Sequence, residues 1–168
     1  GTPASAAGGP AAVSAWCMWD VKLPALLCPS DGMTSTALRQ NNYVFCIGDS
    51  SRATNTTQQV RGTFGVQVCY GVRDMLDGTS NTIMMSEAVR GTGQSTGISS
   101  TGSQQVVNWI TQYDVNSGTP SGCAALANGS TYNTGIQVKS MRGGALWDGQ
   151  FERCGFNTIL PPNAAGCS

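Results

Sequence analysis

The sequence contains no histidine, and this absence removes most of the usual arrangements of catalytic side chains. Histidine is the commonest general base, the base of the Ser-His and Cys-His nucleophile pairs, and a frequent zinc ligand. Two carboxylates can hydrolyse a glycoside only when they lie across the sugar, and the closest acidic pair, Asp74 and Asp77, lies beside a turn instead. We therefore expect a non-enzymatic protein with no catalytic residues and no cofactor.

Charge and long apolar runs are also scarce. Charged residues make up 11% of the chain, 9 basic and 9 acidic, against about a quarter in an ordinary soluble domain. The chain has no net charge, and its few basic residues form no cluster, so we expect no nucleic-acid partner. The longest apolar runs, such as Tyr43–Ile47, are far too short to cross a bilayer, which predicts no membrane-spanning segment in this chain.

The polar residues of this chain are mostly uncharged. Ser, Thr, Asn and Gln together supply 54 of the 168 residues, while 40% of the residues are hydrophobic, which is enough for a core. Residues 1–15 are almost all small and show no periodicity, so we expect a flexible or extended N-terminal arm. Residues 16–168 then form a single β-rich domain.

The seven cysteines favour disulfides over a metal site or a redox pair. No two of them have the close spacing of zinc ligands or of a Cys-x-x-Cys pair. Disulfides and two glycosylation sequons, at Asn55 and Asn128, both predict export to an extracellular or cell-surface location. The odd count leaves one cysteine free or paired with another chain, and the connectivity stays open. The candidates are Cys17, Cys28, Cys46, Cys69, Cys123, Cys154 and Cys167.

Periodicity along the chain favours short strands. The predicted strands cover residues 43–47, 64–70, 82–89, 107–113, 136–138 and 145–147. Residues 23–28 are predicted to be extended and to precede a tight turn at 29–32. Residues 72–76 are predicted to form one helical turn that ends before Gly78. Two polar tracts, 90–104 and 114–135, are predicted to be long ordered loops. The fold class is therefore α+β, predominantly antiparallel β with little helix and stabilised by disulfides.

Two groups of residues have both a structural and a functional interpretation. Asp74, Asp77 and Glu87 are candidate calcium ligands, but their spacing does not match an EF-hand loop. We expect instead that Asp74 caps a short helix and that Asp77 closes an Asx turn. The four tryptophans are well separated, and we expect core or inter-subunit packing in preference to a sugar-stacking surface.

Several short strings carry a resemblance over about residues 23–168. They are Leu-Cys-Pro-Ser-Asp at 27–31, Asn-Tyr-Val at 42–44, Gly-Thr-Phe-Gly at 62–65, Asp-Gly-Thr-Ser-Asn-Thr-Ile at 77–83, Arg-Gly-Gly at 142–144 and Leu-Pro-Pro-Asn at 160–163. In this order the chain resembles a large family of secreted, prepilin-like proteins of unknown function that is abundant in planctomycete bacteria. The resemblance implies a pilin-like globular head, exported through a type II secretion pseudopilin or type IV pilin route.

The chain departs from the pattern of that family in two places. The N-terminal hydrophobic helix and the C-terminal histidine-containing segment that the resemblance implies are both missing from the sequence. Either the chain is a fragment or this member is processed to a head alone. In the second case, assembly through a central helical bundle would not apply.

The resulting hypothesis is an extracellular, pilin-like structural subunit that assembles with copies of itself into a filament, tube or surface layer. Zero net charge lets identical surfaces approach, and an arm or an open strand edge can link neighbours. The alternative is a monomeric secreted binding module or minor pseudopilin that holds a glycan or a protein through loops 90–104 and 114–135.

Overall fold

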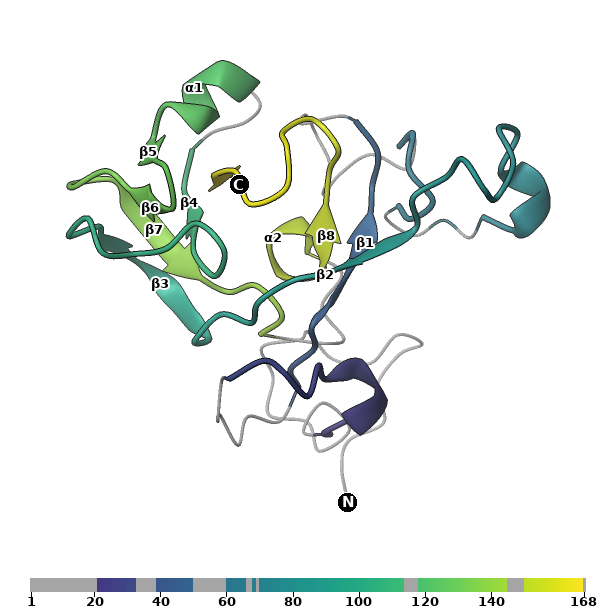
Figure 1. The fold of residues 1–168 in the computed structure, drawn as a ribbon, viewed down its shortest axis with the longest axis horizontal. Coiled ribbons are helices and arrows are strands. Elements are labelled where there is room, and N and C mark those ends of the chain that lie inside the picture. Colours follow the sequence, from purple (N-terminus) through teal and green to yellow (C-terminus); the bar gives the residue numbers. More distant parts are fainter. Residues whose placement is uncertain are drawn as a thin grey trace, which may run out of the picture.

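The chain folds as short strands with little helix, which confirms the predicted α+β class (Figure 1). This computed structural model describes residues 21–32, 39–49, 60–65, 68, 70–113, 118–144 and 150–167. The predicted arm at 1–15 and the strand predicted at 145–147 lie outside the described residues. The helical elements are η1 (Pro24–Leu26), η2 (Val72–Asp74), α1 (Pro120–Ala124) and α2 (Phe151–Cys154). The strands are β1 (Tyr43–Cys46), β2 (Met85–Glu87), β3 (Gln94–Ser99), β4 (Ile110–Thr111), β5 (Ala127–Asn128), β6 (Thr131–Tyr132), β7 (Gln137–Ser140), β8 (Gly155–Phe156) and β9 (Gly166–Cys167).

The apolar run predicted at 43–47 forms β1, the central strand of a three-stranded sheet with the order β2-β1-β8. It pairs antiparallel with β2, where Tyr43 lies opposite Glu87, and parallel with β8. Val44 and Cys46 point into the interior and are buried. The alternation of buried and half-buried residues along β1 follows from the period of two of a strand.

A second sheet has the order β3-β7-β4-β9, and β5 and β6 form a separate hairpin. Val138 and Ser140 of β7 are fully enclosed, and both residues of β4 are buried as well. The pairing of β4 with β9 is parallel, like that of β1 with β8, so the sheets are mixed and not purely antiparallel. The hydrophobic core gathers beside this sheet around Val106, Cys123, Tyr132, Val138 and Ala165.

The two tracts predicted to be long loops contain regular structure. Residues 90–104 include the six-residue strand β3, which pairs with β7 through a register shift between Gln94 and Ile98. Residues 114–135 include α1 and the β5–β6 hairpin. The loop predictions were wrong because most side chains of β3 are exposed, so the strand has no apolar alternation to reveal it.

Four other predictions hold only in part. Gly65 and Val68 pair with each other in an isolated bridge, so the predicted strand at 64–70 is a tight reversal where it is described. The strands predicted at 82–89 and 107–113 shrink to Met85–Glu87 and Ile110–Thr111. The segment predicted to be extended at 23–28 contains the 3-10 turn η1. The helical turn predicted at 72–76 is confirmed as η2.

Candidate functional site

A cavity of about 810 Å³ is lined by residues of both larger sheets, of α1 and α2, and of the C-terminal segment 156–167. This volume lies within the range of small-molecule and peptide sites. Much of its wall is apolar. The apolar lining includes Val44, Ile83, Ile110, Phe151, Phe156 and Leu160. The cavity is therefore suited to an apolar group.

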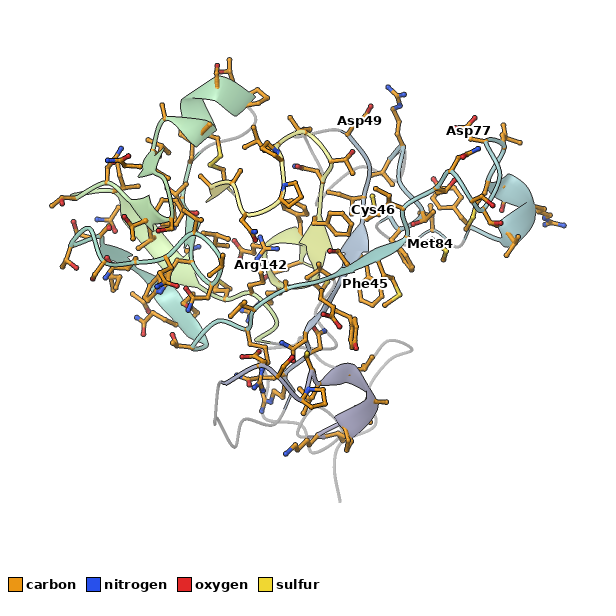
Figure 2. The ribbon with its side chains drawn as sticks, in the orientation of Figure 1. Phe45, Cys46, Asp49, Asp77, Met84 and Arg142 are labelled. Atoms are coloured by element: carbon orange, nitrogen blue, oxygen red, sulfur yellow. A yellow bond between two sulfur atoms is a disulfide. The ribbon has the colours of Figure 1, made fainter. Side chains whose placement is uncertain are left out.

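Arg142 supplies the positive charge of this cavity. Among the described lining residues it alone carries a basic side chain, and Figure 2 places it in the body of the molecule near the C-terminal segment. Burial lowers the pKa of Arg142 below its ordinary value, although a guanidinium stays charged in proteins. Its side chain makes no ion pair or hydrogen bond with another described residue. A half-buried cation with no ion-pair partner among the described residues therefore faces the cavity.

Glu87 and Tyr43 lie opposite each other at the end of the β1–β2 ladder. The negative charge of Glu87 raises the pKa of Tyr43, since ionisation of the phenol would place two negative charges side by side. Glu87 also lines the cavity. The cavity thus has acidic and basic groups on its wall.

Asp31 and Arg90 form a buried ion pair beside the cavity. Arg90 Nε donates to Asp31 Oδ2 at 2.9 Å, and the two side chains are 6% and 7% exposed. Arg90 Nη1 also donates to Gln40 Oε1 at 2.9 Å, and Asn42 Nδ2 donates to Asp31 Oδ2 at 2.5 Å. Because these partners satisfy one another, the charges can stay inside without a large penalty. The cluster fixes the part of the wall that Asp31 and Asn42 supply.

Three strings that carry the family resemblance meet at this cluster. Cys28 N donates to Asn42 Oδ1 at 2.9 Å, and Asn41 N donates to Gly143 O at 3.0 Å. Gly143 has a φ of 64°, and a β-carbon there would lie only 2.2 Å from Asn41 O. Only glycine fits both the backbone conformation and the close approach. The strings at 27–31, 42–44 and 142–144 are therefore parts of one structural unit.

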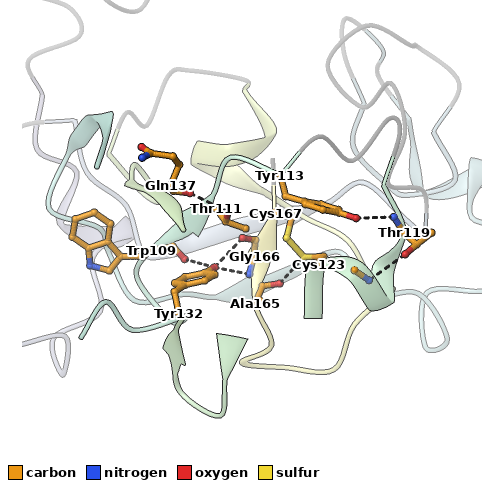
Figure 3. Close-up of a disulfide and its surroundings, with 11 residues drawn as sticks. Trp109, Thr111, Tyr113, Thr119, Cys123, Tyr132, Gln137, Ala165, Gly166 and Cys167 are labelled. Carbon is orange, nitrogen blue, oxygen red and sulfur yellow. Dashed lines mark hydrogen bonds between the residues drawn. A yellow bond between two sulfur atoms is a disulfide. The ribbon is translucent and has the colours of Figure 1, made fainter. Parts of the chain in front are cut away.

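Tyr132 and the disulfide Cys123–Cys167 hold the C-terminal strand against the core (Figure 3). Gly166 N donates to the Tyr132 hydroxyl at 3.0 Å, and that hydroxyl lies 2.9 Å from Gly166 O and 3.0 Å from Trp109 O. Burial raises the pKa of Tyr132 to about 12. The disulfide joins α1 to β9, so both lining segments are fixed relative to each other.

Residues 70–82, here called the apolar lobe, extend away from the two sheets at the right of Figure 1. Leu76 is 93% exposed and Val72 is 70% exposed. The next exposed apolar residues along the chain are Ile83, Met84 and Met85. The lobe is held by its own bonds: Gly71 N donates to Asp74 Oδ2 at 2.7 Å, and Asn81 Nδ2 donates to Asp77 O at 2.9 Å. An ordered segment therefore presents apolar side chains to solvent.

The three candidate calcium ligands do not form a metal site. In the described part of the chain, no group of three or more Cys, Asp or Glu side chains is arranged to hold a metal ion. Asp74 caps η2 from within its first turn, as expected. The Asx turn expected at Asp77 is not seen, because among the described residues only its backbone carbonyl accepts a bond, from Asn81 Nδ2. Asp77 lies in the lobe (Figure 2), whereas Glu87 belongs to β2 and lines the cavity.

The cysteine and glycosylation candidates divide into described and undescribed positions. Cys123–Cys167 confirms one disulfide, while Cys28 is half-buried and Cys46 is buried, both as thiols. The Cys154 thiol lies 3.5 Å from Gln150 O. Cys17, Cys69 and Asn55 lie outside the described residues. Asn128 is exposed in the β5–β6 hairpin, so a glycan can reach it, although glycosylation stays a prediction.

Sequence reasoning missed both Arg142 and the pair Asp31–Arg90. Arg142 belongs to the Arg-Gly-Gly string, and nothing in the local sequence indicates that its side chain faces a cavity. Asp31 and Arg90 are 59 residues apart, so no spacing rule connects them. Trp109, by contrast, packs against the core as expected, and the other tryptophans lie outside the described residues.

The comparisons with known proteins yield one family. A family model described as "Protein of unknown function (DUF1559)" matches residues 2–155. No curated protein matches the chain, and no solved structure matches it. No helix among the described residues has both the length and the apolar character that a membrane crossing requires.

Proposed function

The chain belongs to this family of unknown function, and from its geometry we propose that it is a non-enzymatic, extracellular, pilin-like structural subunit. Copies of the subunit assemble with one another into a filament, tube or surface layer. The apolar lobe is the observation that carries this proposal.

A lobe of this kind is costly for a protein that stays alone in water. Leu76 and Val72 leave most of their apolar surface in water, and Ile83, Met84 and Met85 are exposed where the chain returns to the sheet. Exposed apolar side chains held in an ordered segment are suited to an interaction site, because their burial against a partner is favourable. An ordered lobe also loses little conformational entropy on binding. The lobe is thus suited to contact another protein surface.

Two further features support assembly outside the cell. β2 is the edge strand of its sheet within the described residues, and an open edge can accept a strand from a neighbour. The disulfide Cys123–Cys167 fits an oxidising compartment. The zero net charge lowers the repulsion between identical copies.

Sedimentation velocity and negative-stain microscopy of the full chain over a range of concentrations test this proposal. We expect mass that rises with concentration and regular polymers on the grid. A chain that sediments as a monomer at every concentration and gives only dispersed globules contradicts the proposal.

The second candidate is a secreted binding module, favoured by the cavity. Residues 118–120 and 123, from the tract at 114–135, line it, whereas the tract at 90–104 supplies no described lining residue. A small molecule or glycan that copurifies with a monomeric chain, detected by native mass spectrometry, would support this candidate over assembly.

A further inference from the structure

We propose that the apolar lobe of one copy inserts into the cavity of the next copy, with Asp77 of the inserted lobe pairing with Arg142. This inference rests on the proposed function and names the contact by which copies join. It arises from two surfaces of the same chain, neither of which is covered by the described part of its own copy.

The first surface is the lobe itself. Its most exposed apolar side chain, Leu76, directly precedes Asp77, so an apolar group and a carboxylate lie together. The lobe is preformed: Gly78 N donates to Met75 O at 3.1 Å, and Thr82 Oγ1 donates to Gly78 O at 3.0 Å. A preformed lobe can enter a cavity without first being ordered.

The second surface is the cavity. Its volume of about 810 Å³ is large enough for the side chains of a short turn, and its wall is largely apolar. The apolar rim residue Ile83 is exposed, so the apolar surface of the cavity continues to the outside. Insertion of Leu76 would remove apolar surface from water on both sides of the contact.

Arg142 offers an acidic occupant one point of contact, while Glu87 and Glu152 also line the cavity. Arg142 makes no ion pair or hydrogen bond to another described residue, and the Asp77 carboxylate likewise has no partner within the described part of the chain. A half-buried guanidinium is stabilised by a carboxylate, which it can bind through two parallel N–H bonds. Figure 2 shows Asp77 toward the end of the lobe and Arg142 in the body, so the two charges do not meet within one copy. They can meet between two copies.

The symmetry of this contact decides the form of the assembly. Lobe and cavity are different surfaces, so each copy uses one of them toward each neighbour. Such a heterologous contact propagates head to tail, and it gives an open filament unless the rotation between copies closes a ring. The lobe-and-cavity contact therefore explains why copies would form a linear polymer and not a closed dimer.

Association of purified full-length variants, measured by sedimentation velocity, tests the contact. We expect Leu76→Asp, Asp77→Arg and Arg142→Asp each to raise the concentration of half-assembly by about tenfold or more. Asp49→Arg is the matched control, because it makes the same charge change at an exposed residue outside the lobe and the cavity. It should assemble like the unmodified chain.

Mixing two variants shows whether association is lost because the contact is broken or because a variant does not fold. The Arg142→Asp variant retains the original lobe and the Asp77→Arg variant retains the original cavity, so an equimolar mixture should associate although neither variant does so alone. The double variant Asp77→Arg with Arg142→Asp should also recover association, since the pair is reversed. Both recoveries require folded proteins and the stated pairing.

The outcomes are distinguishable from those of the general proposal. If the unmodified chain polymerises and all three single variants polymerise equally well, the lobe-and-cavity contact is overturned while self-assembly stands. If the unmodified chain is monomeric throughout, both fail. A copurifying small molecule that disappears in the Arg142→Asp variant would assign the cavity to that ligand and overturn the second copy as its occupant.

Discussion

Asp31 and Arg90, which are 59 residues apart in the chain, form an ion pair whose two side chains are almost fully buried. The pair joins the turn after η1 to the segment after β2 and forms part of the region beside the cavity. Substitutions in this pair therefore test how much the region beside the cavity contributes to the free energy of unfolding.

Removing one member of this pair should destabilise the fold strongly. Asp31→Ala leaves the Arg90 guanidinium buried without its carboxylate, which should lower the free energy of unfolding by about 3–5 kcal/mol. Urea denaturation measures the loss. The exposed pair Asp49–Arg61, at 3.2 Å, is the control, and Asp49→Ala should cost less than about 1 kcal/mol because exposed ion pairs contribute little. Equal effects of the two variants would show that the buried pair has no special role.

The disulfide should stabilise the fold, because it closes a long loop in the unfolded chain. Cys123 and Cys167 are 44 residues apart, and the chain-entropy estimate for such a loop is about 4 kcal/mol. We expect the double variant Cys123→Ser with Cys167→Ser to lose stability of this order in urea unfolding. Cys28→Ser, which removes a half-buried thiol outside any disulfide, should change stability by less than about 1 kcal/mol. A double variant as stable as Cys28→Ser would contradict the prediction.

Gly143 should tolerate no side chain. Its φ of 64° and the 2.2 Å approach of a β-carbon to Asn41 O combine backbone strain with a clash, so Gly143→Ala should cost about 3 kcal/mol or more. Gly129 has a similar φ of 62° but open space around it, and Gly129→Ala should cost only about 1–2 kcal/mol. Thermal unfolding of both variants checks the difference, and similar melting temperatures would rule out the close approach.

Tyr132 should make stability depend on pH in alkaline solution. Burial raises its pKa to about 12 from about 10, so the neutral phenol is favoured in the folded state. The stabilisation is fully present below pH 10 and is lost as the pH rises through 12, by about 2–3 kcal/mol in total. Urea unfolding of the unmodified chain between these pH values should show the decline.

Two phenylalanine variants test whether the alkaline loss of stability comes from Tyr132 or from an exposed tyrosine. Tyr132→Phe should be less stable at pH 8 by about 1–2 kcal/mol, because the bonds to Gly166 and Trp109 are lost. It should also lack most of the alkaline decline. Tyr70→Phe changes an exposed ring and should keep the decline of the unmodified chain. A decline that is the same in all three proteins would exclude Tyr132 as its cause.

Local chemistry made part of the fold predictable. The apolar run at 43–47 forms the central strand β1, and the turn chemistry at 72–78 forms η2 and a left-handed Gly78. The prediction of a loop at 90–104 failed for a physical reason. β3 pairs through its backbone with β7, while its polar side chains face solvent. A strand of that kind leaves no hydrophobic period in the sequence.

The sequence by itself determined the absence of histidine, the low charge, the central apolar strand and the cysteines available for disulfides. Only the tertiary structure decided that Cys123 pairs with Cys167, that Asp31 meets Arg90, and that Arg142 faces an apolar cavity while Leu76 stays in water. Periodicity and turn chemistry act over a few residues, so they can be read along the chain. Partners 44 and 59 residues apart are chosen by how the sheets pack, which no local pattern encodes.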